Sequence, residues 1–402
     1  MSKKYSKNFL RVPYGQTVHD KEEITAVVRV LKTSTQMGQN VASFEKKIAV
    51  LFNKKYGIMT NSGSSALFLA IESLGYKKNS EVITPILTFS TTIACLVKNN
   101  LIPSFVDVTK DTFCIDINQI EKKINRNTVA ILAPDLLGNI CEWDKIKKIA
   151  RKYNLDILQD SADTLGATFK NKSSGYFTDL SITSFYGSHI INGAGNGGML
   201  CTSNKKILEK SKLLRSWGRS SSLFKDSDSY NKRFDTFLDG IQYDSKFIFS
   251  EIGYQLEPSE ISAAFALIQL KKLKKNLKLR KKFFNEHQNF FLSYNDIFQL
   301  PNENKYSNTG WLAYPLVVKP NANFTRTDLQ LFLESKNIQT RVIFTGNILR
   351  QPGFKNIKCK GSVNDFKNAD FIMKGGILIA CHHGLNKKMM NHIHNSIRNF
   401  LS

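Results

Sequence analysis

Four short stretches of the sequence carry residue types that could bind a phosphorylated ring and move protons on it. The first, TNSGSSA at 60–66, is a hydroxyl-rich turn just before an apolar run at 67–74. A helix that begins there would offer free backbone N–H groups and hydroxyls to a phosphate. A simple helix N-cap would use the same residue types, so the turn alone leaves both interpretations open.

Carboxylates end one of the apolar runs. Asp160 is the last residue of LDILQD, and Asp163 follows three residues later. A carboxylate at the carboxyl end of a strand lies where open α/β sheets bind ligands. Beside a pyridine nitrogen, such a carboxylate would keep that nitrogen protonated and make the ring an electron sink. Helix capping explains the position equally well.

A tight turn contains a candidate base. The stretch SFYGSH at 184–189 runs into the glycine-rich GAGNGG at 193–198. Such glycine density indicates close approach of the backbone to another group, and Ser184 could add a hydroxyl to a phosphate. His189 could transfer protons near neutral pH. A single histidine is nevertheless more often structural than catalytic.

One aromatic side chain completes the set. Phe89 lies in LTFSTT, directly after the apolar run VITP, and could cover a flat ring. A single Phe is otherwise expected in the core. No stretch is specific alone, but the order of the four along the chain is informative.

The elements that would position these residues alternate between strands and helices. This alternation is the signature of βαβ units around a mostly parallel sheet, so we predict an α/β fold. Strand-like runs lie at 82–85, 102–108, 128–134, 155–160, 180–185 and 197–203, and helical patterns between them include 119–124 and 143–153.

The second half of the chain changes character. Residues 220–249 are polar and irregular, longer than a normal connection. A helical pattern then runs from Pro258, which a first helical turn tolerates, to about residue 289. We predict a large cofactor-binding α/β domain over 1–255, and the long helix with a smaller α+β domain over 256–402. The small domain would contain strands near 311–318, 339–344 and 376–381 and helices near 328–335 and 387–400.

Composition limits the function classes. The 402 residues, 42% hydrophobic, can bury a large core, and neither a signal peptide nor ~18 consecutive apolar residues occur. We therefore expect a cytoplasmic protein with no membrane partner. The net charge of +24 comes without a nucleic-acid motif, and its densest cluster, at 271–282, should lie on the solvated face of the long helix. The six cysteines form no C-x-x-C pair, so neither a disulfide framework nor a metal site is expected.

Together, these stretches resemble the nucleotide-sugar aminotransferases, which are pyridoxal-phosphate enzymes of the aspartate-aminotransferase fold (fold type I). The resemblance extends from about Arg11 to the C-terminus. It implies a homodimer with shared active sites, in which the loop at Tyr254 and Gln255 reaches the partner's cofactor phosphate. Most relatives have Asn where this chain has Gln255. The segments that carry the resemblance are SGSSA, VITPILTF, FVDV, QDSADTLGA, SFYGSH, GNGGM and IGYQLEPSEISAAFALIQL.

The resemblance also assigns cofactor contacts by position. Phe89 would stack on the cofactor ring, Asp160 would meet the pyridine nitrogen and Asp163 would lie near the phenolic oxygen. The residues that it implies for the cofactor phosphate are Gly63, Ser64, Ser65 and Ser184.

His189 stands where the aminotransferases have the lysine that forms a Schiff base with the cofactor. Imidazole cannot form that bond, and SFYGSHIINGAGNGG contains no lysine, so the cofactor would be held noncovalently and could stay as pyridoxamine phosphate. A histidine here marks the sugar 3-dehydratase branch, which deoxygenates nucleotide-linked 4-keto-6-deoxyhexoses in deoxysugar biosynthesis, as for lipopolysaccharide O-antigen. The implied mechanism joins the cofactor amine to the C4 ketone. His189 then removes a proton from the cofactor methylene and the 3-hydroxyl leaves.

Some dehydratases of this branch carry a [2Fe–2S] cluster on four cysteines and use a reductase. The loop after residue 216 and the segment 340–354 look closest to that kind. The corresponding positions here supply no thiolate, so we expect no iron–sulfur cluster and regeneration of pyridoxamine phosphate by glutamate. These positions are Ala162, Ser220, Ser222 and Tyr230.

Two alternatives stay open. The chain could catalyse another reaction of a cofactor amine on a keto sugar, such as a sugar amination, which the mass of the product would distinguish. It could also be a non-catalytic relative. The retained Asp160 and Ser184 argue against the latter, because a protein without cofactor gains nothing from a complete ring and phosphate pocket.

Overall fold

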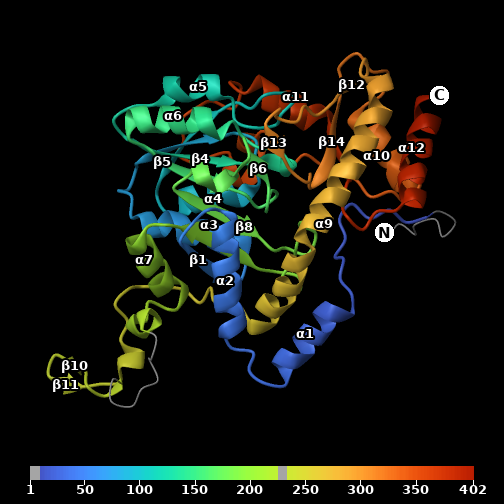
Figure 1. Ribbon diagram of the computed structural model, residues 1–402. Helices are drawn as coiled ribbons and strands as arrows, with labels where there is room; N and C mark the ends of the chain where they lie inside the picture. Colours follow the sequence, from blue (N-terminus) through green and yellow to red (C-terminus); the bar gives the residue numbers. More distant parts are fainter. Residues whose placement is uncertain (1–9, 225–232) are drawn as a thin grey trace.

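A seven-stranded sheet forms the centre of the computed structural model, which describes residues 10–224 and 233–402 (Figure 1). Its strands are β1 (Tyr56–Thr60), β2 (Glu81–Pro85), β3 (Ile102–Val106), β4 (Thr128–Pro134), β5 (Asp156–Asp160), β8 (Leu180–Ser184) and β9 (Gly198–Thr202). Their order is β1-β9-β8-β5-β4-β2-β3. Neighbours from β8 to β3 are parallel, whereas β9 runs antiparallel to β1 and β8. The sheet is therefore mostly parallel, as predicted.

Helices cover both faces of this sheet, because successive residues of a strand point to opposite sides. Val82 and Leu132 pack with one group of helices, and Ile83 and Ile131 pack with the other. The first group is α3 (Gly63–Leu74), α4 (Ser90–Lys98) and α7 (Lys205–Arg215), and the second is α5 (Ile117–Lys123) and α6 (Trp143–Tyr153).

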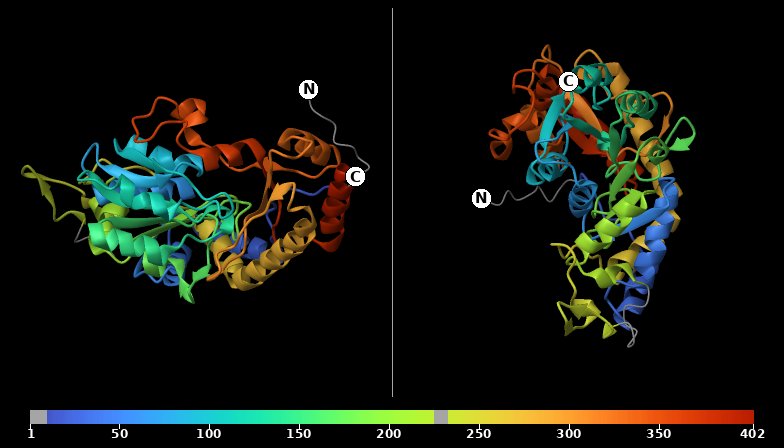
Figure 2. Two further views of the ribbon diagram at one scale, coloured as in Figure 1. Left: turned by 90° about the horizontal axis from the view of Figure 1, so that it is seen from above. Right: turned by 90° about the vertical axis from the view of Figure 1, so that its left-hand side faces the viewer.

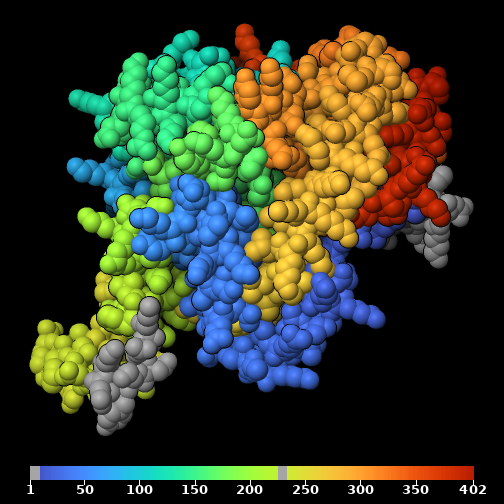
Figure 3. Space-filling view, in the orientation of Figure 1, coloured from blue at the N-terminus to red at the C-terminus, as the bar shows by residue number. Residues whose placement is uncertain are grey.

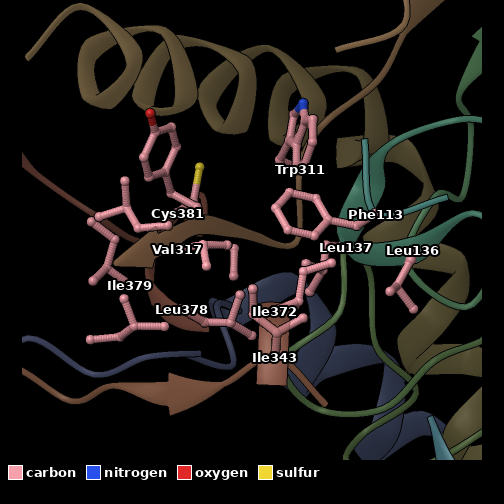
Figure 4. Close-up of a cluster of buried hydrophobic side chains, with 14 of the residues drawn as sticks. Phe113, Leu136, Leu137, Trp311, Val317, Ile343, Ile372, Leu378, Ile379 and Cys381 are labelled. Carbon is pink, nitrogen blue, oxygen red and sulfur yellow. The ribbon is translucent and has the colours of Figure 1, made fainter. Parts of the chain in front are cut away.

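A second, antiparallel sheet lies toward the other end of the molecule, beside the C-terminal helices (Figure 2). A shared apolar core joins it to the first sheet, where Leu137 and Phe113 lie near Trp311 (Figure 4). Its strands, in spatial order, are β12 (Phe298–Gln299), β14 (Ala313–Val318), β16 (Gly376–Ala380) and β15 (Arg341–Val342). The helices around it are α10 (Arg326–Ser335), α11 (Lys367–Gly375) and α12 (Lys387–Leu401).

The long helix α9 (Glu260–Phe291) runs along both parts of the molecule (Figure 1). Its first half packs against α1 (Lys21–Leu31) and α2 (Gln39–Leu51), and its second half contributes to the core of the second sheet. Two small sheets lie outside these parts of the described chain. One has three strands, β13 (Ser307–Asn308), β6 (Thr168–Phe169) and β7 (Lys172–Ser173), and the other is the hairpin of β10 (Phe237–Leu238) and β11 (Ile241–Gln242).

The six strand-like runs between 82 and 203 are all strands, but several boundaries differ from the sequence prediction. β1 was not predicted. α3 begins at Gly63 rather than near residue 67, because Ser62 caps it. α9 is capped by Ser259, so Pro258 precedes the helix instead of lying in its first turn. The domain division at residue 255 stays a prediction. No helix in the described ranges is long and apolar enough to cross a membrane.

A histidine pair, His287 buried and His394 half-buried, should make the fold sensitive to acid. Nε2 of His287 lies 2.9 Å from the carbonyl of Ala380, so it donates, and Nδ1 accepts from Nε2 of His394 at 3.0 Å. Burial lowers the pKa of His287 to about 3 and that of His394 to about 4. Between about pH 6.5 and pH 4 the unfolded chain therefore binds more protons than the folded chain, and stability falls as the pH falls.

We expect the free energy of unfolding to decrease by up to about 1.4 kcal/mol per pH unit for each such group in that window. Thermal and urea unfolding at pH 7, 6 and 5 would measure this slope. His287→Gln should reduce the slope, and the exposed control His19→Asn should not. An equal slope in wild type and His287→Gln would contradict the assignment.

Candidate active site

The carboxyl ends of the central strands open onto a cavity of about 520 Å³, a volume that suits a small-molecule ligand. Pro134, Asp160 and Ser184, the last residues of β4, β5 and β8, all line it. Tyr14, Leu312 and Phe344 come to the same cavity from outside the central sheet. It therefore lies at the ligand-binding edge of an α/β sheet, closed by residues near the second sheet.

The N-terminus of α3 forms one wall. Ser62 caps the helix by accepting from the N–H of Ser65 at 3.1 Å. Gly63 and Ser64 line the cavity, and Ser62, which the sequence prediction omitted, lines it too. The hydroxyl of Ser65 instead donates to Asn61 at 2.6 Å and lies outside the lining. The N-cap and the phosphate interpretations of this turn are thus compatible.

Glycine at position 63 permits close packing of this wall against β8. A Cβ at Gly63 would lie 2.7 Å from the Cβ of Ser184, which is too close for a real contact. The Ser184 hydroxyl accepts from the N–H of Tyr186 at 3.3 Å, which leaves its proton available. Hydroxyls and free N–H groups therefore converge at one end of the cavity, as a phosphate requires.

Asp160 lines the cavity as a buried carboxyl. It accepts from the Thr92 hydroxyl at 2.9 Å and from the N–H of Ala162 at 3.2 Å. Burial raises its pKa. No Lys, Arg or His in the described ranges forms an ion pair with it, so a cationic ligand group would relieve the cost of its burial. A protonated pyridine nitrogen meets that requirement.

Asp163 and His189 lie next to each other in the wall of the cavity. Asp163 accepts from the N–H of Leu137 at 2.9 Å, and burial raises its pKa to about 7. Nε2 of His189 lies 3.9 Å from Oδ1 of Asp163. Nδ1 of His189 lies 3.4 Å from the carbonyl of Ser184, which can only accept, so we assign the proton to Nδ1.

The imidazole of His189 is neutral at pH 7, because burial lowers its pKa to about 4. Its unprotonated Nε2 is therefore available to take a proton. A histidine with only a structural role in the core would have both ring nitrogens hydrogen-bonded. The His189 ring instead lines a cavity, and its Nε2 has no hydrogen bond to the described part of the chain.

Phe89 does not belong to the core. Its side chain is 54% exposed at the cavity, where it meets Phe344 edge to face at a centroid distance of 5.8 Å. Phe344 has a φ of 41°, an unusual backbone conformation for a bulky residue, and such positions cluster at functional sites. Sequence reasoning missed Phe344, Tyr14 and Thr92, because nothing in their local sequence distinguishes them from core residues.

Gln255 is not among the described residues that line the cavity of its own chain. It is exposed and forms an isolated bridge with Ser216, and the neighbouring Tyr254 hydroxyl donates to Glu72 at 2.8 Å. Its predicted role in a partner's site stays a prediction.

The positions compared with the iron–sulfur cysteines are only partly described. Ala162 lines the cavity, Ser220 and Ser222 lie in a short turn, and Tyr230 falls outside the described residues. Across the described ranges, no cluster of three His, Cys, Asp or Glu side chains could hold a metal.

The fold and the cavity define a pyridoxal-phosphate enzyme with the aspartate-aminotransferase fold, fold type I. The model of the DegT/DnrJ/EryC1/StrS aminotransferase family matches residues 17–398, and the chain belongs to this family. The predictions of family, fold and of a pyridoxal or pyridoxamine phosphate cofactor are thereby confirmed.

Three related proteins show what the chain is similar to. It is 32% identical over 402 residues to the lipopolysaccharide biosynthesis protein RfbH of Salmonella typhimurium, covering 96% of this chain and 91% of the relative. It is 30% identical over 382 residues to the GDP-4-keto-6-deoxy-D-mannose 3-dehydratase of Escherichia coli O55:H7, covering 93% and 96%. A crystal structure of GDP-4-keto-6-deoxymannose-3-dehydratase with a trapped PLP-glutamate geminal diamine has a TM-score of 0.85 and 27% identity, covering 96% and 100%.

Proposed function

We propose that this chain is a cluster-free, pyridoxamine-phosphate-dependent 3-dehydratase of a nucleotide-linked 4-keto-6-deoxyhexose. The observation that carries the proposal is a neutral imidazole, His189, that lines the cavity. The family resemblance implies a cofactor lysine at this position. No lysine is among the described residues that line the cavity. The name of the Escherichia coli relative supports the same activity.

The residues at the cavity fit the cofactor. Gly63, Ser64 and Ser184 would hold its phosphate, Phe89 would cover its ring, and Asp160 would hold its protonated nitrogen. When bound, pyridoxamine phosphate supplies an amine that can attach to a keto carbon and a ring that takes up electrons.

His189 would move the proton at Nε2. The hydrogen bond from Nδ1 to the Ser184 carbonyl sets the orientation of the ring. Asp163 lies 3.9 Å from Nε2, and in its ionised form it would stabilise an imidazolium there. His189 can therefore accept a proton, hold it briefly and return it, as a general base and acid does.

Glutamate is the proposed amino donor and reductant. Loss of the 3-hydroxyl replaces a C–O bond by a C–H bond, so the sugar gains two electrons, and oxidation of glutamate to its keto acid would supply them. The donated nitrogen would leave as ammonia and the hydroxyl as water. The solved relative with a trapped PLP-glutamate adduct supports this donor. The name of the Salmonella relative supports a place in lipopolysaccharide biosynthesis.

A second copy of this chain is the proposed partner. The hairpin of β10 and β11 stands away from the body of the molecule, at the lower left of Figure 3. In the hairpin and in the segment that follows it, Phe237, Ile241, Phe247 and Ile252 are more than half exposed, and Ile252 reaches 94%. Apolar surface of this kind marks an interface. Light scattering should give twice the mass of one chain, and a monomer would contradict the dimer.

The activity can be tested with pyridoxamine phosphate, glutamate and a panel of GDP-, CDP- and dTDP-linked 4-keto-6-deoxy sugars, read by mass spectrometry. We expect one of the sugars to lose the mass of one oxygen atom. Repeated turnover should require glutamate, because it regenerates pyridoxamine phosphate. An aminated product that retains its 3-hydroxyl would identify a sugar aminotransferase instead. Cofactor binding, seen as a visible absorption band, without any product would indicate a non-catalytic relative.

A further inference from the structure

One face of α9 forms hydrogen bonds to residues 188–193, the turn that contains His189. Four polar residues occur at intervals of seven, seven and four, which places them on one side of a helix. Each makes a hydrogen bond to the turn. Ser262 donates to the carbonyl of Gly193 at 2.8 Å, Gln269 accepts from Asn192 at 3.4 Å, Asn276 donates to the carbonyl of Ile190 at 3.0 Å, and Arg280 contacts Ser188 and His189.

Arg280 is the centre of this arrangement. Nη2 donates to the carbonyls of Ser188 and His189 at 3.1 and 3.2 Å. Nη1 donates to the carbonyls of Trp311 and Leu312 at 3.1 and 3.0 Å. Nε donates to Nδ1 of the His383 ring at 3.2 Å. These five hydrogen bonds match the five N–H donors of a guanidinium group.

The burial of Arg280 requires an explanation. Its side chain is completely buried, and no carboxylate in the described part of the chain lies within ion-pair distance, although the charge of Asp163 acts on it from farther away. A buried charge without a direct ion pair is costly, and a hydrophobic side chain would fill the same space at lower cost. We predicted from the sequence that the basic cluster at 271–282 lies on the solvated face of the long helix. For Arg280 this prediction is wrong, because its side chain is buried. Lys274, Lys275 and Lys278 of the same cluster are exposed.

We propose that Arg280 is the positioning residue for His189, fixing the backbone of Ser188 and His189 to the cavity wall at Trp311 and Leu312 so that Nε2 keeps its place. This inference rests on the proposed role of His189 as the base. A proton-transfer group must hold its geometry within about 0.5 Å to work efficiently. The positive charge of Arg280 also opposes protonation of the imidazole and helps keep its pKa low.

Two substitutions separate the geometry from the charge. Arg280→Lys keeps the charge, but a single ammonium cannot bond five acceptors in a plane. Arg280→Met removes the charge as well. The matched control Lys278→Gln removes one positive charge from an exposed position of the same helix.

For Arg280→Lys we expect kcat to fall about 100-fold, with the KM for the sugar nucleotide changed less than about threefold, because misplacement of the base affects the chemical step. For Arg280→Met we expect the same loss and a rise of the His189 pKa that stays below the ordinary histidine value, because burial is the main cause of its lowering. Carbon-13-labelled histidine NMR of the protein without substrate would measure this titration, with the His189 signal assigned from His189→Asn. Lys278→Gln should match the wild type in both readouts.

Circular dichroism and thermal unfolding would confirm that each variant is folded. If Arg280→Met does not fold, the kcat of Arg280→Lys alone tests the proposal. Wild-type kcat in folded Arg280→Lys would overturn the proposal, and so would an unchanged His189 titration in folded Arg280→Met. Failure of the proposed function can be distinguished from failure of this inference. The first would appear as full activity in His189→Asn, whereas the titration of His189 reports on Arg280 without any turnover.

Discussion

Substituting His189 by Asn should lower the rate of deoxygenation by about 10²- to 10⁴-fold, the usual contribution of a general base. The amide can still donate to the Ser184 carbonyl, so the turn and the cavity should be preserved. It has no basic nitrogen to replace Nε2, which lies 3.9 Å from Asp163 in the native protein. Single-turnover kinetics with pyridoxamine phosphate and the sugar nucleotide would isolate the proton-transfer step.

His189→Lys should have the opposite effect on the cofactor. A lysine amine can bond covalently to the aldehyde of pyridoxal phosphate, as imidazole cannot. We expect covalent attachment together with loss of deoxygenation, measured by absorption spectroscopy and product mass. Full dehydratase activity in either variant would remove His189 from the mechanism.

Substituting Asp160 by Asn should abolish most activity while the fold is retained. The neutral amide can still accept from Thr92, which donates to Asp160 at 2.9 Å, but it cannot stabilise a protonated pyridine nitrogen. We expect at least about a 100-fold loss of kcat, in line with the loss of one preorganised electrostatic contact. Cofactor affinity, measured by absorption titration, should also fall.

The cofactor-free form of Asp160→Asn provides the control. Burial raises the pKa of the native carboxyl, so a neutral side chain of the same shape relieves part of that cost. The melting temperature without cofactor should therefore equal or exceed that of the wild type. Unchanged turnover would show that the cofactor ring does not bind against Asp160.

The central sheet was predictable because its strands are continuous apolar runs, the pattern of strands buried on both faces. Asp160 and Ser184 could be placed at the ligand edge for the same reason, since both end such runs. β1 was missed because its five residues include Gly57, and its partner β9 lies far away in the sequence. No local periodicity reports that pairing.

Other features of the site depend on tertiary packing. Tyr14 and Phe344 reach the cavity from segments more than 300 residues apart, and residue type does not distinguish them from core aromatics. Arg280 looked like one more member of a basic surface cluster. Only the proximity of α9 to the turn at Ser188 and His189 reveals that it points inward.

Whether the resting protein holds its cofactor without a covalent bond can be measured by loading the wild type with pyridoxal phosphate, reducing it with borohydride and determining its mass after denaturation. Because an imidazole occupies the place of the usual amine, we expect the mass of the unmodified chain, with His189→Lys as the positive control. A stoichiometric gain of one pyridoxyl group in the wild type would contradict a dehydratase built on His189.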